Sequence, residues 1–181
     1  MKLINDFEEI LVNDEQIQEA CERLAVQITK DYAEADCPLF LGLLKGCHPF
    51  MSDFLCLVDL YHTVDYMDVS SYFGDNKSTG EVKILKDITT SVTDKDVIIV
   101  EDIVESGRTI KKVKDLLLFR GAKSVEVVTM IDKPSGRTVD LDPKYVGHTI
   151  GDGFLIGYGL DYKEMYRNVR AIGTPKKEIL D

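Results

Sequence analysis

The spacing of hydrophobic residues switches repeatedly between the period of a helix and that of a strand. Hydrophobic positions recur with helical spacing over 13–34, where Asn13 is a suitable N-cap, so an amphipathic helix is predicted there. Similar signals predict helices over 49–60 and 107–120, with Gly121 as the C-cap of the second. Short apolar or alternating runs predict strands at 38–44, 63–70, 82–88, 97–100, 125–131, 145–150 and 154–160.

Strands that alternate with helices along the chain indicate an α/β fold. That order favours a mainly parallel central sheet flanked by helices, with ligands bound beyond the carboxyl ends of the strands. Residues 72–81 are polar, glycine-punctuated and free of aliphatic side chains, which predicts a long loop. No internal repeat, low-complexity stretch or linker divides the sequence, so residues 1–181 are expected to form a single domain.

Composition and charge narrow the possible functions. The chain is 44% hydrophobic and 30% charged, as in an ordinary globular protein, and no apolar run approaches the roughly 20 residues of a membrane-spanning helix. An acidic N-terminus without an apolar signal core leads us to expect a cytoplasmic location. The net charge of −10 opposes binding to nucleic acid or to anionic membranes. A phosphorylated ligand would therefore need local backbone N–H groups, a few placed cations and a metal ion.

The segment VIIVEDIVESGRTI, residues 97–110, concentrates the groups that can do chemistry. A buried strand leads into Glu101 and Asp102, a third acid follows at Glu105, and Ser-Gly-Arg-Thr then opens a helix. Backbone N–H groups and hydroxyls at a helix N-terminus form an anion site, and Gly107 lets the chain approach the anion closely. Each feature alone is common on protein surfaces, but their combination at one strand end is specific. The sequence contains no Gly-Lys-Ser/Thr of a P-loop. Gly151-Asp-Gly153 is not a dinucleotide-binding fingerprint either, because it lacks the third glycine and precedes a predicted strand and not a helix.

This segment resembles the phosphoribosyl pyrophosphate signature of type I phosphoribosyltransferases. Further segments, in family order, resemble those of the hypoxanthine (hypoxanthine-guanine) phosphoribosyltransferases. They are the pyrophosphate loop at 43–46, the mobile loop at 70–84, the purine-recognition segment at 131–134 and the C-terminal purine and metal segment at 154–167. The resemblance implies a mainly parallel central sheet flanked by helices, with a small hood formed by the chain ends. It also allows a cis peptide before Lys45, which the sequence leaves open.

The resemblance implies a reaction and a role for each motif residue. The 5-phosphoribosyl group of phosphoribosyl pyrophosphate would pass to hypoxanthine, and to guanine, giving IMP or GMP plus pyrophosphate in purine salvage. The family's proton acceptor is an aspartate, whereas this chain has Glu105, which is expected to accept the purine ring proton despite its extra methylene. The residues expected to bind phosphoribosyl pyrophosphate are Lys45, Gly46, Glu101, Asp102, Ser106, Gly107, Arg108, Thr109 and Arg167.

The remaining expectations concern the base, the loop and the metal. Ser71 and Tyr72 are expected to ride on a mobile loop that closes over the reacting centre. Magnesium is the expected cofactor, because carboxylate and pyrophosphate oxygens are its preferred ligands. Its expected ligands, directly or through water, are Glu101, Asp102 and Asp161. The residues expected to bind the purine are Lys133, Phe154, Leu155 and Asp161.

Other interpretations of these residues stay open. Without the resemblance, Arg167 would be a surface arginine, Phe154 a core aromatic of a strand and Lys133 an ordinary loop residue. One alternative function is a sister phosphoribosyltransferase that prefers xanthine or guanine. Another is a weakly catalytic nucleotide-binding regulator, which only the glutamate at position 105 supports. The expected partners are small-molecule substrates and further copies of this chain, as a homodimer or homotetramer, with no nucleic acid and no membrane.

Overall fold

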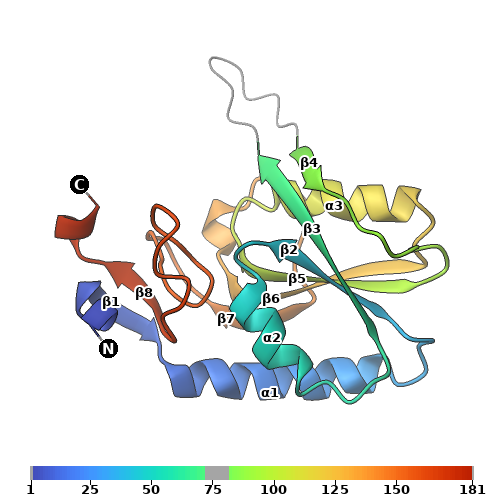
Figure 1. Cartoon of the computed structure of the whole chain (residues 1–181), viewed down its shortest axis with the longest axis horizontal. Coiled ribbons are helices and arrows are strands. Elements are labelled where there is room, and N and C mark those ends of the chain that lie inside the picture. Colours follow the sequence, from blue (N-terminus) through green and yellow to red (C-terminus); the bar gives the residue numbers. More distant parts are fainter. Residues whose placement is uncertain (1, 72–81, 181) are drawn as a thin grey trace.

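Runs of branched apolar residues form the central sheet of the computed structural model, which describes residues 2–71 and 82–180 (Figure 1). The sheet has six strands in the order β4-β3-β2-β5-β6-β7. All neighbours are parallel except β3 and β4, which are antiparallel. The strands are β2 (Leu39–Leu44), β3 (Thr63–Ser71), β4 (Val82–Lys86), β5 (Asp96–Val104), β6 (Ser124–Asp132) and β7 (Tyr145–Thr149).

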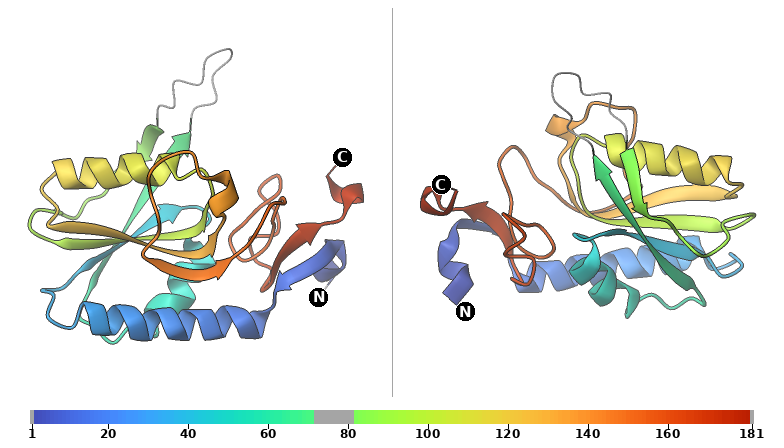
Figure 2. Two further views of the ribbon diagram at one scale, coloured as in Figure 1. Left: turned by 180° about the vertical axis from the view of Figure 1, so that it is seen from behind. Right: turned by 45° about the horizontal axis from the view of Figure 1, so that its top comes forward.

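Helices cover both faces of this sheet (Figure 2). Helices α1 (Asp14–Asp31) and α2 (His48–Leu55) pack with one set of strand side chains, and α3 (Arg108–Phe119) packs with the other. Asn13 caps α1 as predicted, because its side chain accepts a hydrogen bond from the Gln16 N–H at 2.9 Å. The Asn13 N–H in turn donates to the Gln16 side-chain oxygen, also at 2.9 Å. In the described residues no helix is both long enough and apolar enough to cross a bilayer.

The two ends of the chain form the expected hood beside the sheet. Strand β1 (Phe7–Val12) pairs antiparallel with β8 (Ile172–Pro175), and Figures 1 and 2 place both termini there. Short 3-10 turns flank the pair, namely η1 (Lys2–Asp6) and η3 (Lys177–Ile179). The hood has a small apolar cluster of its own, which consists of Phe7, Ile156, Tyr166, Val169 and Ala171.

Three sequence predictions need correction. The strand predicted at 154–160 is wrong, because Gly157, Tyr158 and Gly159 have positive φ values of 97°, 47° and 102°, which an extended strand does not allow. The helix predicted at 49–60 ends at Leu55. The strand predicted at 97–100 continues to Val104 as β5, so its acids lie within the strand and not after it.

Asp65 on β3 organises the connection that follows β4. This buried carboxylate accepts hydrogen bonds from the N–H groups of Tyr66, Thr89 and Thr90 at 2.7, 2.8 and 2.9 Å. Burial alone would raise the pKa of Asp65, but these backbone hydrogen bonds outweigh it and hold the pKa well below its usual value. Ionised Asp65 therefore stabilises the native state.

Asp65→Asn is expected to lower the free energy of unfolding at pH 7 by about 1.5–3 kcal/mol, because it weakens hydrogen bonds to a charged group. A depressed native pKa adds stability above the unfolded-state pKa of about 3.9, and this contribution is lost as pH falls through the native pKa. The difference between variant and wild type should therefore shrink below about pH 4. Urea unfolding at several pH values tests this, with exposed Asp36→Asn as the control; an equal difference at every pH would contradict it.

Candidate active site

The carboxyl ends of three neighbouring parallel strands bring the predicted residues together. Lys45 and Gly46 follow β2, Glu105 and Ser106 follow β5, and Lys133 follows β6. In register, Val100 of β5 lies between Gly42 of β2 and Val128 of β6, so the three strands end near one another. Open parallel sheets bind ligands beyond the carboxyl ends of their strands, and we call this side of the sheet its carboxyl edge.

The first hollow at this edge lies between β5 and α3, and we call it the β5–α3 hollow. Its volume is about 160 Å³, and Gly107 has a left-handed φ of 74° as it begins α3. Glu101 reaches this hollow with Oε2 buried and without a hydrogen-bond partner among residues 2–71 and 82–180. Burial, with nearby Asp102, raises the pKa of Glu101. The lining residues are Glu101, Ile103, Val104, Glu105, Ser106, Gly107, Thr109 and Ile110.

Arg108 does not line the β5–α3 hollow. Its Nε donates a hydrogen bond to Thr138 Oγ1 at 2.8 Å, and the side chain is exposed. Its backbone N–H meets the Ser106 hydroxyl at 3.4 Å. The structure therefore groups Ser106, Gly107 and Thr109 around the hollow but directs the arginine side chain toward the 138 region.

A second hollow, which we call the Lys133 hollow, has a volume of about 230 Å³. Lys133 Nζ is almost fully buried and donates to Glu105 Oε1 and to the Gly153 carbonyl, both at 2.8 Å. Phe154 is 50% exposed and packs edge-to-face with Tyr162, so it is not the core strand residue that the sequence allowed. The lining residues are Asp102, Ile103, Glu105, Lys133, Gly153, Phe154, Leu155, Leu160 and Asp161.

Adjacent acids on β5 serve different hollows. Successive side chains of a strand point to opposite sides, so Glu101 lines the β5–α3 hollow and Asp102 lines the Lys133 hollow. Burial raises the pKa of Asp102 to about 6, although the Ile103 N–H bond and the positive charge of Arg167 oppose the rise. A Cβ built on Gly46 would overlap Asp102 Oδ2, so the Asp102 carboxylate packs directly against the loop after β2.

A partly exposed ion-pair network connects that loop to the C-terminal segment. Lys45 pairs with Glu164 at 3.0 Å, and Arg167 pairs with Asp161 at 2.7 Å and with Glu164 at 3.5 Å. Arg167 also donates to the Gly159 carbonyl at 2.6 Å. The peptide before Lys45 is cis. Sequence reasoning missed Glu164, because an isolated exposed acid gives no motif signal.

The described residues contain no group of three or more His, Cys, Asp or Glu side chains that could hold a metal ion by itself. The predicted set of Glu101, Asp102 and Asp161 is divided between the two hollows. Magnesium commonly takes only one or two carboxylates and completes its shell with water and substrate phosphates. The unpartnered oxygen of Glu101 and the donor chemistry of these acids fit that mode of binding.

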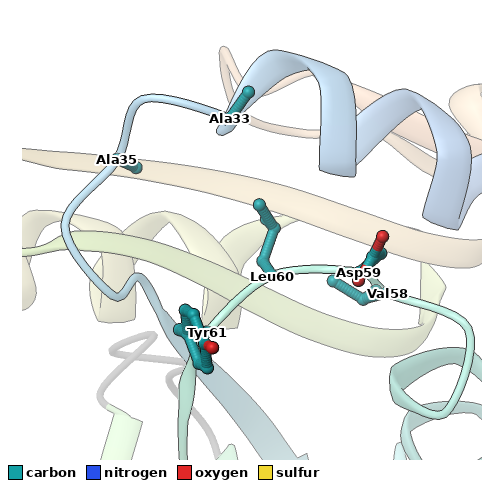
Figure 3. Close-up of a pocket in the computed structure, with 6 residues that line it drawn as sticks. All are labelled: Ala33, Ala35, Val58, Asp59, Leu60 and Tyr61. Atoms are coloured by element: carbon teal, nitrogen blue, oxygen red, sulfur yellow. The ribbon is translucent and has the colours of Figure 1, made fainter.

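Two further features lie outside this grouping. Ser71 is the last residue of β3, and Tyr72 lies outside the described residues, so the predicted loop contacts stay predictions. A third hollow of about 470 Å³ opens between the connections that precede β2 and β3, at the opposite edge of the sheet (Figure 3). It contains none of the predicted site residues and is lined by Ala33, Ala35, Val58, Asp59, Leu60 and Tyr61.

A family model for the phosphoribosyl transferase domain matches residues 9–163. The chain belongs to the phosphoribosyltransferase family. A curated hypoxanthine-guanine phosphoribosyltransferase from Staphylococcus aureus (strain Mu50) is 49% identical over 176 residues, 97% of each chain. A crystal structure of a hypoxanthine phosphoribosyltransferase from S. aureus has a TM-score of 0.94 at 48% identity and covers 100% of this chain and 98% of its own.

A more distant phosphoribosyltransferase has the same fold. It is a hypoxanthine-guanine phosphoribosyltransferase from Bacillus anthracis, whose crystal structure has a HEPES molecule in the active site. Its TM-score is 0.89 at 39% identity, and the match covers 94% of this chain and 99% of that one. These relatives place the chain among the hypoxanthine-guanine phosphoribosyltransferases and confirm the type I phosphoribosyltransferase fold expected from the motifs.

Gly46→Ala is expected to lower kcat/KM for phosphoribosyl transfer about 100-fold, because the added methyl must displace Asp102 by an ångström or more. Gly46 has no positive φ, so the substitution itself strains no backbone. Steady-state kinetics and a crystal structure of the variant test both parts. Gly151→Ala is the matched control, because its Cβ would meet no atom of the described residues within 4 Å apart from its chain neighbours. An unmoved Asp102 would contradict the prediction.

Proposed function

We propose that this protein transfers the 5-phosphoribosyl group from phosphoribosyl pyrophosphate to hypoxanthine or guanine and releases pyrophosphate, as a purine salvage enzyme. The observation that carries the proposal is a buried lysine that faces an acid in one hollow, beside a helix N-terminus that lines a second. The pair of Lys133 and Glu105 suits the polar edge of a purine, and the N-terminus of α3 suits a phosphate. Neighbouring residues of β5 line the two hollows, Glu101 the β5–α3 hollow and Asp102 the Lys133 hollow.

Lys133 supports a 6-oxopurine as the acceptor. An ammonium group has only donors, so it suits the exocyclic oxygen of hypoxanthine or guanine and not the amino group of adenine. The Lys133 side chain is 6% exposed, which strengthens any hydrogen bond that it donates to a ligand. Half-exposed Phe154 offers a ring face for the base, and Leu155 follows it at the edge of the same hollow.

Glu105 is the proposed proton acceptor. A purine ring nitrogen forms the bond to the anomeric carbon, the bond from that carbon to pyrophosphate breaks, and the ring N–H proton passes to the Glu105 carboxylate. The Glu105 side chain is 54% exposed, and its Oε1 lies 2.8 Å from Lys133 Nζ. A purine whose exocyclic oxygen accepts a hydrogen bond from Lys133 would therefore present the ring nitrogen next to that oxygen to Glu105. General base catalysis of this kind contributes about 10²–10⁴-fold to a rate.

The other site residues divide between the two ends of the activated sugar. Ser106, Gly107 and Thr109 would hold the 5-phosphate through hydroxyl and N–H groups, and the Arg108 backbone N–H would join them. Lys45, Gly46 and Arg167 would bind pyrophosphate.

The three acids assigned to magnesium complete the proposed site. Glu101, Asp102 and Asp161 would hold the ion directly or through water. When bound, the ion would neutralise charge that develops on the leaving pyrophosphate. Ser71 and Tyr72 would belong to a loop that closes over the sugar and keeps water out.

We further propose that residues 1–181 act as one domain, in the cytoplasm, as a homodimer or homotetramer. A preference for xanthine or guanine, and a regulator of weak catalytic power, are the competing functions. The arrangement of Lys45, Asp161 and Arg167 around one loop supports an enzyme that handles pyrophosphate. Comparing hypoxanthine, guanine, xanthine and adenine in an absorbance assay distinguishes the enzyme functions.

Glu105→Gln is expected to lower kcat about 10²–10⁴-fold, because glutamine keeps the shape of the side chain but cannot accept the proton. Affinity for phosphoribosyl pyrophosphate should remain, since Glu105 is not among the residues proposed to bind its phosphates. Steady-state kinetics with hypoxanthine measure the loss, and exposed Glu34→Gln is the control. Unchanged turnover in Glu105→Gln would remove this residue from the mechanism.

Removal of divalent metal is expected to weaken binding of phosphoribosyl pyrophosphate by at least about 100-fold, because the acidic site then faces the pyrophosphate oxygens without a shared cation. Isothermal titration calorimetry with and without magnesium measures this change. Magnesium-independent affinity would contradict the proposed use of Glu101, Asp102 and Asp161.

A further inference from the structure

Gly136 lies directly against the side chain of Glu105. It ends the short 3-10 turn η2 (Pro134–Gly136), which follows Lys133. A Cβ built on Gly136 would be 2.5 Å from Glu105 Cγ, 3.2 Å from Oε1 and 3.3 Å from Cδ. Apart from the chain neighbours of Gly136, these are the three nearest atoms in the part of the chain that the structure describes, and all belong to Glu105.

The backbone does not explain this glycine. Gly136 has no positive φ, so an alanine could adopt the same conformation without strain. The methyl group of an alanine would nevertheless lie 2.5 Å from the Cγ methylene of Glu105, which is closer than Cβ atoms approach other atoms in real proteins. The space that Gly136 leaves is therefore space for the aliphatic part of Glu105.

The turn cannot easily move aside to relieve such a contact. Arg137, the next residue, is 10% exposed in its side chain, and its Nε donates to the Glu105 carbonyl at 3.0 Å. Its other nitrogens donate to the Leu141 carbonyl and to Asp132. The Glu105 side chain is 54% exposed and has room to rotate. A methyl group at position 136 would therefore displace the glutamate and leave the turn in place.

We propose that Gly136 is a positioning residue for phosphoribosyl transfer, which admits the methylene chain of Glu105 and keeps its carboxylate against Lys133. This inference rests on the proposed function, because it assigns Glu105 the purine ring proton. The atom that a Cβ on Gly136 would meet first is the Cγ methylene of Glu105, so the missing side chain at position 136 accommodates that methylene. A displacement of about 1 Å at a catalytic group can lower a rate about 100-fold.

Gly136→Ala tests the proposal through kinetics. We expect kcat to fall about 10- to 100-fold while KM for phosphoribosyl pyrophosphate changes less than about twofold. Gly151→Ala is the matched control, because a Cβ there is more than 4 Å from every described residue except its chain neighbours, and its φ is not positive. It should leave both constants unchanged.

A double-mutant cycle separates positioning from a general structural effect. In a Glu105→Ala background the clashing atoms are absent, so adding Gly136→Ala should change kcat by less than about twofold. Thermal unfolding of all four proteins accompanies the kinetics. If Gly136→Ala alone were unstable, the double variant should regain stability, because the overlap involves only Glu105.

The outcomes are separable. Full kcat in Gly136→Ala, or the same loss in both backgrounds, would overturn the inference and leave the proposed function standing. Instability that persists in the double variant would also overturn it, because the methyl would then disrupt the turn and not the glutamate. A wild-type protein that forms no nucleotide from any 6-oxopurine would overturn the proposed function, and the inference with it.

Discussion

Close packing of Asp102 against two glycines joins the three parts of the site. A Cβ on Gly46 would overlap the carboxylate, and one on Gly159 would overlap the Gly46 carbonyl and come within 3.5 Å of Asp102 Cβ. Strand β5, the loop after β2 and the C-terminal segment therefore meet without space for another side chain. The same contact buries Asp102 and raises its pKa to about 6, so the geometry also sets the charge of the site.

The hood is attached to the sheet layers through a second polar network. Tyr158 donates to Asp53 of α2 at 2.9 Å, and Arg170 donates to the same carboxylate and to Asp14 of α1, at 2.9 and 2.8 Å. Tyr158 directly precedes Gly159, so these bonds hold the segment that touches Gly46. Burial and contact with Asp53 raise the pKa of the Tyr158 hydroxyl.

Strand alternation explains how one short segment serves two hollows. Glu101 and Asp102 are neighbours in sequence, yet the pleat of β5 turns one toward the helix N-terminus and the other toward Lys133. Had the strand ended at residue 100, as the apolar run alone suggested, both acids would lie on a loop with no defined sides. The longer strand pairs Glu101 with Thr129 and Ile103 with Ile131 of β6, so both acids lie within the paired part of β5.

The sequence by itself determined the α/β order, the capped start of α1 and the grouping of motif residues at the carboxyl ends of β2, β5 and β6, because hydrophobic period and motif spacing are local properties. Only the tertiary structure decided what depends on contacts between distant segments. The positive φ values at 157–159, the pairing of Lys45 with Glu164, and the space that Gly136 leaves for Glu105 are of this kind. Lys45 and Glu164, for example, are 119 positions apart, and no local pattern records which backbone will lie against which side chain.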